Sequence, residues 1–119
     1  MVKLNEYLGV QTFQKKKIII PSIDGLEIIK IENIIHCEGE TGYTKIHLKN
    51  GKSMLSSNSI GHFNKLLDSK DFYLVHKSHL INLNYIDKYL NEGYVILNTT
   101  FRVPVSRSRR QDFLELLKK

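Results

Sequence analysis

The sequence has no tryptophan, one cysteine and two prolines, and none of its apolar runs approaches the roughly 18 residues of a membrane-spanning helix. The single cysteine, Cys37, excludes an internal disulfide and a cysteine-rich zinc module. Its apolar neighbours predict a small buried side chain in a reducing compartment. The first residues lack the apolar stretch of a signal peptide. We therefore expect a cytoplasmic protein with no membrane partner.

Patterns typical of enzymes are also missing. The seven glycines are scattered and give neither GxGxxG nor the Walker spacing, so nucleotide binding is not expected. His76 and His79 suggest a metal site, but residues i and i+3 of a strand face opposite sides, so they share one ion only across a bend. Ser78 has no GxSxG or SxxK context, and Glu38 and Glu40 fit a solvated loop. We expect no enzyme, no catalytic residue, no metal and no cofactor.

The composition, 41% hydrophobic and 25% charged over 119 residues, suits one globular domain with one real core. Residues 1–16 carry little pattern and are expected to be a linker or N-terminal arm before a domain at residues 17–119. Apolar faces at helical spacing predict short helices at residues 59–67 and 109–118. Most of the remaining domain has the β-branched runs and alternation of strands. The predicted fold class is mainly β, with small antiparallel sheets and two short helices.

Several segments have patterns that predict particular strands and turns. Residues 43–48 alternate strictly, which predicts one buried and one wet face, and Asn50-Gly51 predicts a hairpin after them. Strand-like sequence also runs from 26 to 36 and from 80 to 90. In the second of these stretches Asn82 is expected to point outward.

The basic residues are unevenly distributed. Lysine and arginine number 18 against 12 acidic residues, a net charge of +6, and the only four arginines fall within nine residues: Arg102, Arg107, Arg109 and Arg110. The guanidinium fork grips phosphate or the edge of guanine bidentately, and cations at a helix N-terminus oppose the macrodipole. Residues 24–40 are instead acidic. This asymmetry favours an oriented nucleic-acid binder over the alternative, a solvated basic surface.

Residues 72–83, FYLVHKSHLINL, closely resemble the LytTR family of bacterial DNA-binding domains. Three further blocks agree, at residues 34–43, at Asn50-Gly51 and at Pro104–Arg107, and the resemblance covers about residues 17–118. It implies an elongated β fold of small antiparallel sheets. It also implies a sequence-specific transcription regulator, the output domain of a two-component response regulator, whose inter-strand loops read successive major grooves of double-stranded DNA.

The resemblance implies partners as well. Family members bind imperfect direct repeats as two copies, so a homodimer on DNA is expected. They usually carry an N-terminal receiver domain, which does not fit before residue 17. The alternatives are an excised domain that retains a tether, which the composition of residues 1–17 favours, and a stand-alone regulator. The alternative function is a protein-interaction or antagonist domain of the same fold, which pairs with another regulator without reading DNA.

The resemblance also implies which residues contact DNA, namely those at positions that match the family's contact residues. Arg107 matches the arginine that reads a base, and Lys77 follows the family's histidine, His76, at a position expected to meet the DNA backbone. His76 has an alternative role as a half-buried histidine bonded to a backbone carbonyl. Arg109 and Arg110, at a helix start, are expected to grip phosphate.

The second reading loop spans Glu38 to Thr44. The histidine that some relatives carry there is absent, and Tyr43 or Thr44 occupies its place. Tyr43 has the alternative of packing on the sheet. Which of the two contacts a base stays open at this point.

Overall fold

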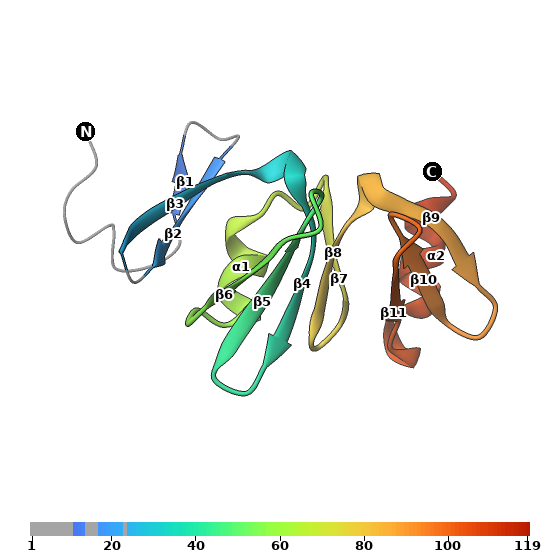
Figure 1. Cartoon of the computed structure of the whole chain (residues 1–119). Helices are drawn as coiled ribbons and strands as arrows, with labels where there is room; N and C mark the ends of the chain where they lie inside the picture. Colours follow the sequence, from blue (N-terminus) through green and yellow to red (C-terminus); the bar gives the residue numbers. More distant parts are fainter. Residues whose placement is uncertain (1–10, 14–16, 23) are drawn as a thin grey trace.

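The computed structural model describes residues 11–13, 17–22 and 24–119, which form an elongated body of 46 × 25 × 25 Å (Figure 1). Three antiparallel sheets follow one another along its length, with two short helices, so the predicted fold class is confirmed. The strands, in spatial order, are β1 (Gln11–Phe13), β2 (Lys17–Ser22) and β3 (Gly25–Lys30) in the N-terminal sheet; β6 (Ser53–Ser56), β5 (Tyr43–Leu48), β4 (Ile34–Glu40), β8 (His79–Asn82) and β7 (Phe72–His76) in the central sheet; β11 (Phe101–Pro104), β10 (Tyr94–Leu97) and β9 (Ile86–Leu90) in the C-terminal sheet. The helices are α1 (Ile60–Leu66) and α2 (Arg110–Leu117).

Part of the predicted N-terminal arm belongs to the first sheet. Gln11–Phe13 pair with β2, whereas residues 1–10 and 14–16 of the arm lie outside the described part of the chain.

The central sheet joins segments that are distant in sequence. β4 and β5 form a hairpin through Thr41 and Gly42, and Gly42 takes the positive φ of 85° that favours glycine. The predicted Asn50-Gly51 turn joins β5 to β6. Oδ1 of Asn50 accepts a 2.9 Å hydrogen bond from the Lys52 amide. β8 then pairs with the other edge of β4.

Two apolar cores lie on opposite faces of the central sheet. On one face Phe63 of α1 and Ile18 of β2 pack with Ile46 of β5. On the other face Phe113 of α2 packs with Ile81 of β8 and with residues of the C-terminal sheet. The central sheet is therefore buried on both sides over much of its area, whereas the turns at the ends of its strands are largely exposed.

Both long predicted strands are interrupted by a 3₁₀ turn. Ile31–Asn33 separates β3 from β4, and Leu83–Tyr85 separates β8 from β9, so each turn carries the chain from one sheet to the next. The expectation of an outward Asn82 is wrong, because its side chain is only 2% exposed. Its Nδ2 donates to the Ile34 carbonyl at 2.9 Å, and its Oδ1 accepts from the amide of Asn84 at 3.0 Å.

The helices agree with the periodicity. The side chain of Ser59 caps α1 by accepting a 3.2 Å hydrogen bond from the His62 amide. A 3₁₀ turn, Arg107–Arg109, leads from β11 into α2. Among the described residues, no helix is long and apolar enough to span a bilayer.

Candidate nucleic-acid interface

Three connections lie along one edge of the molecule, at the bottom of Figure 1. They are the β4–β5 turn at Thr41–Gly42, the β7–β8 turn at Lys77–Ser78 and the segment from Val105 to Arg107 that follows β11. We call this edge, formed by the three connections, the reading edge. It comprises the loops in which the sequence places its candidate DNA contacts.

Backbone hydrogen bonds fix the connections relative to one another. The amide of Gly39, near the end of β4, donates to the Ser78 carbonyl at 2.8 Å. The amide of Ser106 donates to the Val75 carbonyl at 2.8 Å, and its hydroxyl contacts the same oxygen at 3.3 Å. The reading edge is therefore preorganised, which lowers the entropy cost of binding a rigid duplex.

Two cations project from this edge without internal partners. Lys77 and Arg107 are both exposed. Within the part of the chain that the structure describes, neither side chain has a hydrogen bond or an ion pair. Each is free to meet an anion or a base edge.

The choice between Tyr43 and Thr44 is decided by alternation along β5. Tyr43 is 40% exposed at the start of the strand, whereas Thr44 is fully buried. The Thr44 hydroxyl donates to the carbonyl of Asn58 at 2.7 Å, which holds the segment before α1 against the sheet. The expectation that Thr44 contacts a base is wrong for this geometry, because its one polar group faces the interior.

The other three arginines have structural contacts. Nε of Arg109 donates to the Leu74 carbonyl, and Nε of Arg110 donates to the Val105 carbonyl, each at 3.2 Å. Both side chains are half-buried and tie the start of α2 to β7 and to the segment that follows β11. Arg102 lies 3.5 Å from Glu92 and stacks over the ring of Tyr94. The sequence does not predict these hydrogen bonds and this ion pair. Phosphate contact by Arg109 and Arg110 stays a prediction.

His76 shapes the β7–β8 turn. Its ring is half-buried, and Nδ1 accepts a 3.1 Å hydrogen bond from the Ser78 amide. The alternative role of His76 is correct in the half-burial of the ring but wrong in its hydrogen-bond partner. The ring accepts from a backbone N–H and does not donate to a carbonyl through this nitrogen. This bond orients the exposed Lys77 between them.

Directly behind the β7–β8 turn, one face of the central sheet carries a set of titratable side chains. The register places Glu38 opposite His79, His36 opposite His47, and His76 opposite His79. We call these five residues the histidine cluster. The face looks toward the C-terminal sheet, where Phe101 lies 4.9 Å from the rings of His36 and His47.

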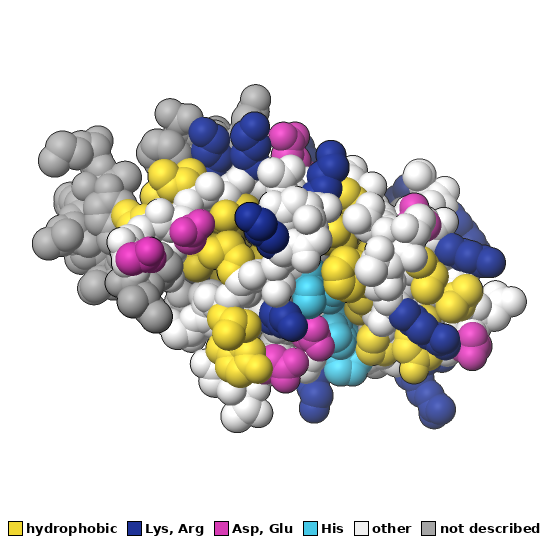
Figure 2. Space-filling model, viewed as in Figure 1, with side chains coloured by type: hydrophobic (Ala, Val, Ile, Leu, Met, Phe, Trp, Pro, Cys, Tyr) yellow, Lys and Arg dark blue, Asp and Glu magenta, His cyan; other side chains and the backbone are white. Residues whose placement is uncertain are grey.

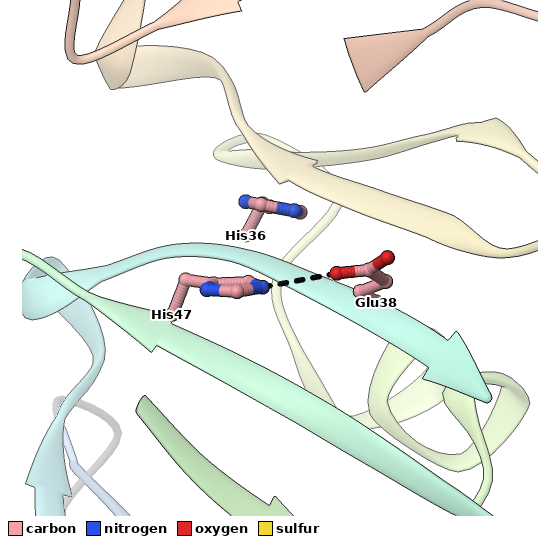
Figure 3. A group of neighbouring side chains, drawn as sticks. All are labelled: His36, Glu38 and His47. Atoms are coloured by element: carbon pink, nitrogen blue, oxygen red, sulfur yellow. Dashed lines mark hydrogen bonds and ion pairs between the residues drawn. The ribbon is translucent and has the colours of Figure 1, made fainter. Parts of the chain in front are cut away.

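The cluster is tightly packed and incompletely hydrogen bonded. The rings of His36 and His47 stack at 4.3 Å, and Nε2 of His47 lies 3.1 Å from Oε1 of Glu38 (Figure 3). In the described chain, Nδ1 of His36 and Nδ1 of His79 are buried without a partner. Such an orphaned polar atom costs about 1–3 kcal/mol.

Burial also sets the charge of these rings. Desolvation lowers the pKa of His36 to about 3, and the like charges of His47 and His79 act in the same direction. Desolvation lowers the pKa of His79 too, although the carboxylate of Glu38 opposes the shift. His36 is therefore a neutral imidazole at neutral pH.

The sequence patterns that predict a metal site pair only His76 with His79 and place Glu38 in a solvated loop, so they do not predict this cluster. A signal was present: a two-residue turn at Thr41-Gly42 places residue 47 opposite residue 36 and keeps Glu38 on the same face. No such local signal predicts that His79 of β8 lies opposite Glu38.

Comparison with known proteins identifies the family and agrees with the fold. The family model of the LytTr DNA-binding domain matches residues 24–118. The heme-containing CO-sensing transcriptional regulator RcoM 2 of Paraburkholderia xenovorans (strain LB400) is 30% identical over 114 residues, and the match covers 91% of this chain but only 39% of that protein. The LytTr DNA-binding domain of a putative methyl-accepting/DNA response regulator from Bacillus cereus has the same fold, with a TM-score of 0.75 and 22% identity over 86% of this chain and 96% of that one. The chain thus belongs to the LytTR family of DNA-binding domains.

Proposed function

We propose that this domain binds double-stranded DNA in a sequence-specific manner and regulates transcription. The observation that carries the proposal is the reading edge, where three fixed connections present the unpaired cations Lys77 and Arg107 together with the exposed Tyr43. Rigid turns with free donors suit insertion into the grooves of a stiff duplex. Membership of a DNA-binding family supports the same function.

Each residue of the edge has a distinct proposed role. Arg107 reads a base in one major groove through its guanidinium fork, and Tyr43 contacts the DNA in a second groove. Lys77 meets a phosphate between them, with His76 holding its turn. This division separates one contact that specifies sequence from others that set position.

We further propose that two copies occupy a direct repeat and that the domain is the output part of a two-component response regulator. The curated relative is named a transcriptional regulator and is longer than this chain, which covers 39% of it. The solved structure is named as part of a putative response regulator. A sensing or receiver part elsewhere in the protein is consistent with both.

The test is selection of bound duplexes from a random pool by the wild-type chain and by Arg107→Ala. We expect the wild type to enrich a direct repeat with half-sites about one helical turn, or roughly 10 base pairs, apart. Arg107→Ala should lose preference at one position of each half-site and weaken binding by about 1–3 kcal/mol, the usual value of a bidentate contact.

Lys88→Ala serves as the matched control, because Lys88 is an exposed cation on β9 rather than on the reading edge. It should enrich the wild-type motif. An unchanged motif with Arg107→Ala would remove Arg107 as the base reader. No enrichment by folded wild-type protein at moderate salt would instead favour an antagonist that pairs with another regulator.

A further inference from the structure

Three residues of the histidine cluster form a donor set that DNA recognition does not use. One ligand atom each from His36, Glu38 and His47 lie within 4.8 Å of one another. Figure 3 shows the two stacked rings with the carboxylate at the end of the His47 ring. All three side chains project from the same face of the β4–β5 hairpin, so the backbone register holds them together.

We propose that His36, Glu38 and His47 bind a divalent transition-metal ion of the zinc class. Two imidazole nitrogens and one carboxylate oxygen are a common zinc donor set, whereas Mg²⁺ and Ca²⁺ prefer oxygen ligands alone. Three protein ligands leave a fourth position for water or for another side chain. His79, whose ring centre lies 6.1 Å from that of His36, is a further imidazole beside the site.

The unpaired nitrogens provide a second, independent observation. His36 is only 3% exposed, and within the described residues its buried Nδ1 has no hydrogen-bond partner; the same holds for the buried Nδ1 of His79. Native proteins satisfy most buried polar atoms, so two orphans in one cluster point to a missing ligand.

Metal binding requires the two near-parallel rings to rotate, because the lone pair of each ring nitrogen lies in the plane of its ring. A tetrahedral ion with bonds of about 2.1 Å holds its ligand atoms about 3.4 Å apart, so the three side chains must close by an ångström or so. The 3.1 Å contact between His47 Nε2 and Glu38 Oε1 is then replaced by two bonds to the ion. A neutral His47 ring that carries its proton on Nε2 changes tautomer, so that the proton stands on Nδ1 and the Nε2 lone pair binds the ion.

The ion has a path from solvent. The Glu38 side chain is 33% exposed and that of His47 is 13% exposed. Histidine side chains form a visible strip at the surface between the central and C-terminal sheets (Figure 2). Binding therefore requires no unfolding, and the occupied site lies directly beneath Phe101 of β11.

The experiment titrates Zn²⁺ into the full chain, free of any polyhistidine tag, in competition with a chromogenic chelator. We expect one ion per chain, and we expect Glu38→Gln and His47→Gln each to weaken binding by at least about tenfold, since even indirect partners of metal sites contribute that much. Co²⁺ should give the intense visible absorption of a four-coordinate site in the wild type and lose it in both variants. The melting temperature should rise with Zn²⁺ in the wild type and not in the Glu38→Gln and His47→Gln variants.

His62→Gln is the matched control, because it removes a histidine on α1 outside the cluster. It should bind Zn²⁺ as the wild type does. Absence of Zn²⁺ binding by the folded wild type, or equal binding by all the variants, would overturn the proposal. If His47→Gln does not fold, Glu38→Gln decides, because Glu38 is partly exposed. This inference does not rest on the proposed function, and the duplex selection and the metal titration succeed or fail separately.

Discussion

At the scale of single residues, one step along β5 separates the surface from the core. Strict alternation of residues 43–48 predicts Thr44 on the buried face, and the structure buries it. The family resemblance nevertheless left Thr44 as a candidate base reader. The physical period of the strand was the better guide, because a buried hydroxyl already bonded to Asn58 is not available to a base.

The two neighbours should therefore respond oppositely to substitution. Thr44→Val removes the donor to the Asn58 carbonyl and should lower the free energy of unfolding by roughly 1–2 kcal/mol without changing the selected DNA motif. Tyr43→Ala should leave stability within about 0.5 kcal/mol and weaken DNA binding. Urea unfolding and duplex binding of both variants provide the measurement. A changed motif with Thr44→Val at unchanged stability would restore Thr44 as a reader.

The arginine cluster gives a mixed result at the same scale. Clustering at a helix start, against the macrodipole, predicts that the charges have a use. Arg109 and Arg110 have a structural one, since their Nε groups bond to carbonyls of Leu74 and Val105. The spacing of the arginines does not reveal these contacts, because the partners are backbone atoms whose positions depend on the fold.

At the scale of elements, strand existence follows from sequence but strand continuity does not. Residues 80–90 have β character throughout, yet Leu83–Tyr85 form a 3₁₀ turn that moves the chain from the central to the C-terminal sheet. Asn82 holds this turn by accepting from the Asn84 amide while it donates to β4. The place of His79 in the histidine cluster is hidden as well, because β4 pairs with β8 across a long stretch of sequence.

Asn82→Ala tests this junction. The side-chain hydrogen bonds to Ile34 and Asn84 are lost at a site that is 2% exposed, and the Ile34 carbonyl loses its side-chain donor, so we expect the free energy of unfolding to fall by about 2–4 kcal/mol. Urea denaturation followed by circular dichroism measures the change. Asn64→Ala, at an exposed position of α1, is the control and should be neutral or slightly stabilising. A loss below about 0.5 kcal/mol for Asn82→Ala would show that the junction does not depend on this side chain.

At the scale of the whole molecule, the central sheet is the shared wall of both cores. Cys37 and Ile46 lie in the core on the α1 side, and Ile81 and Val95 lie in the core on the α2 side. Alternate residues of the same strands contribute to opposite cores. Loss of packing in one core therefore disturbs the strand pairing that the other core depends on. We therefore expect the described domain to unfold as one cooperative unit from the central sheet to α2.

Thiol labelling of Cys37 measures this coupling. The side chain is fully buried, and burial raises the pKa of its thiol to about 12, so labelling of the native protein requires opening. Val95→Ala, in the opposite core, should cost about 2 kcal/mol and accelerate labelling by about 30-fold, the same factor by which it shifts the unfolding equilibrium. Leu55→Ala, at a position 62% exposed, should change neither quantity. If Val95→Ala lowers global stability while the labelling rate of Cys37 stays constant, the two cores open independently and the central sheet does not couple them.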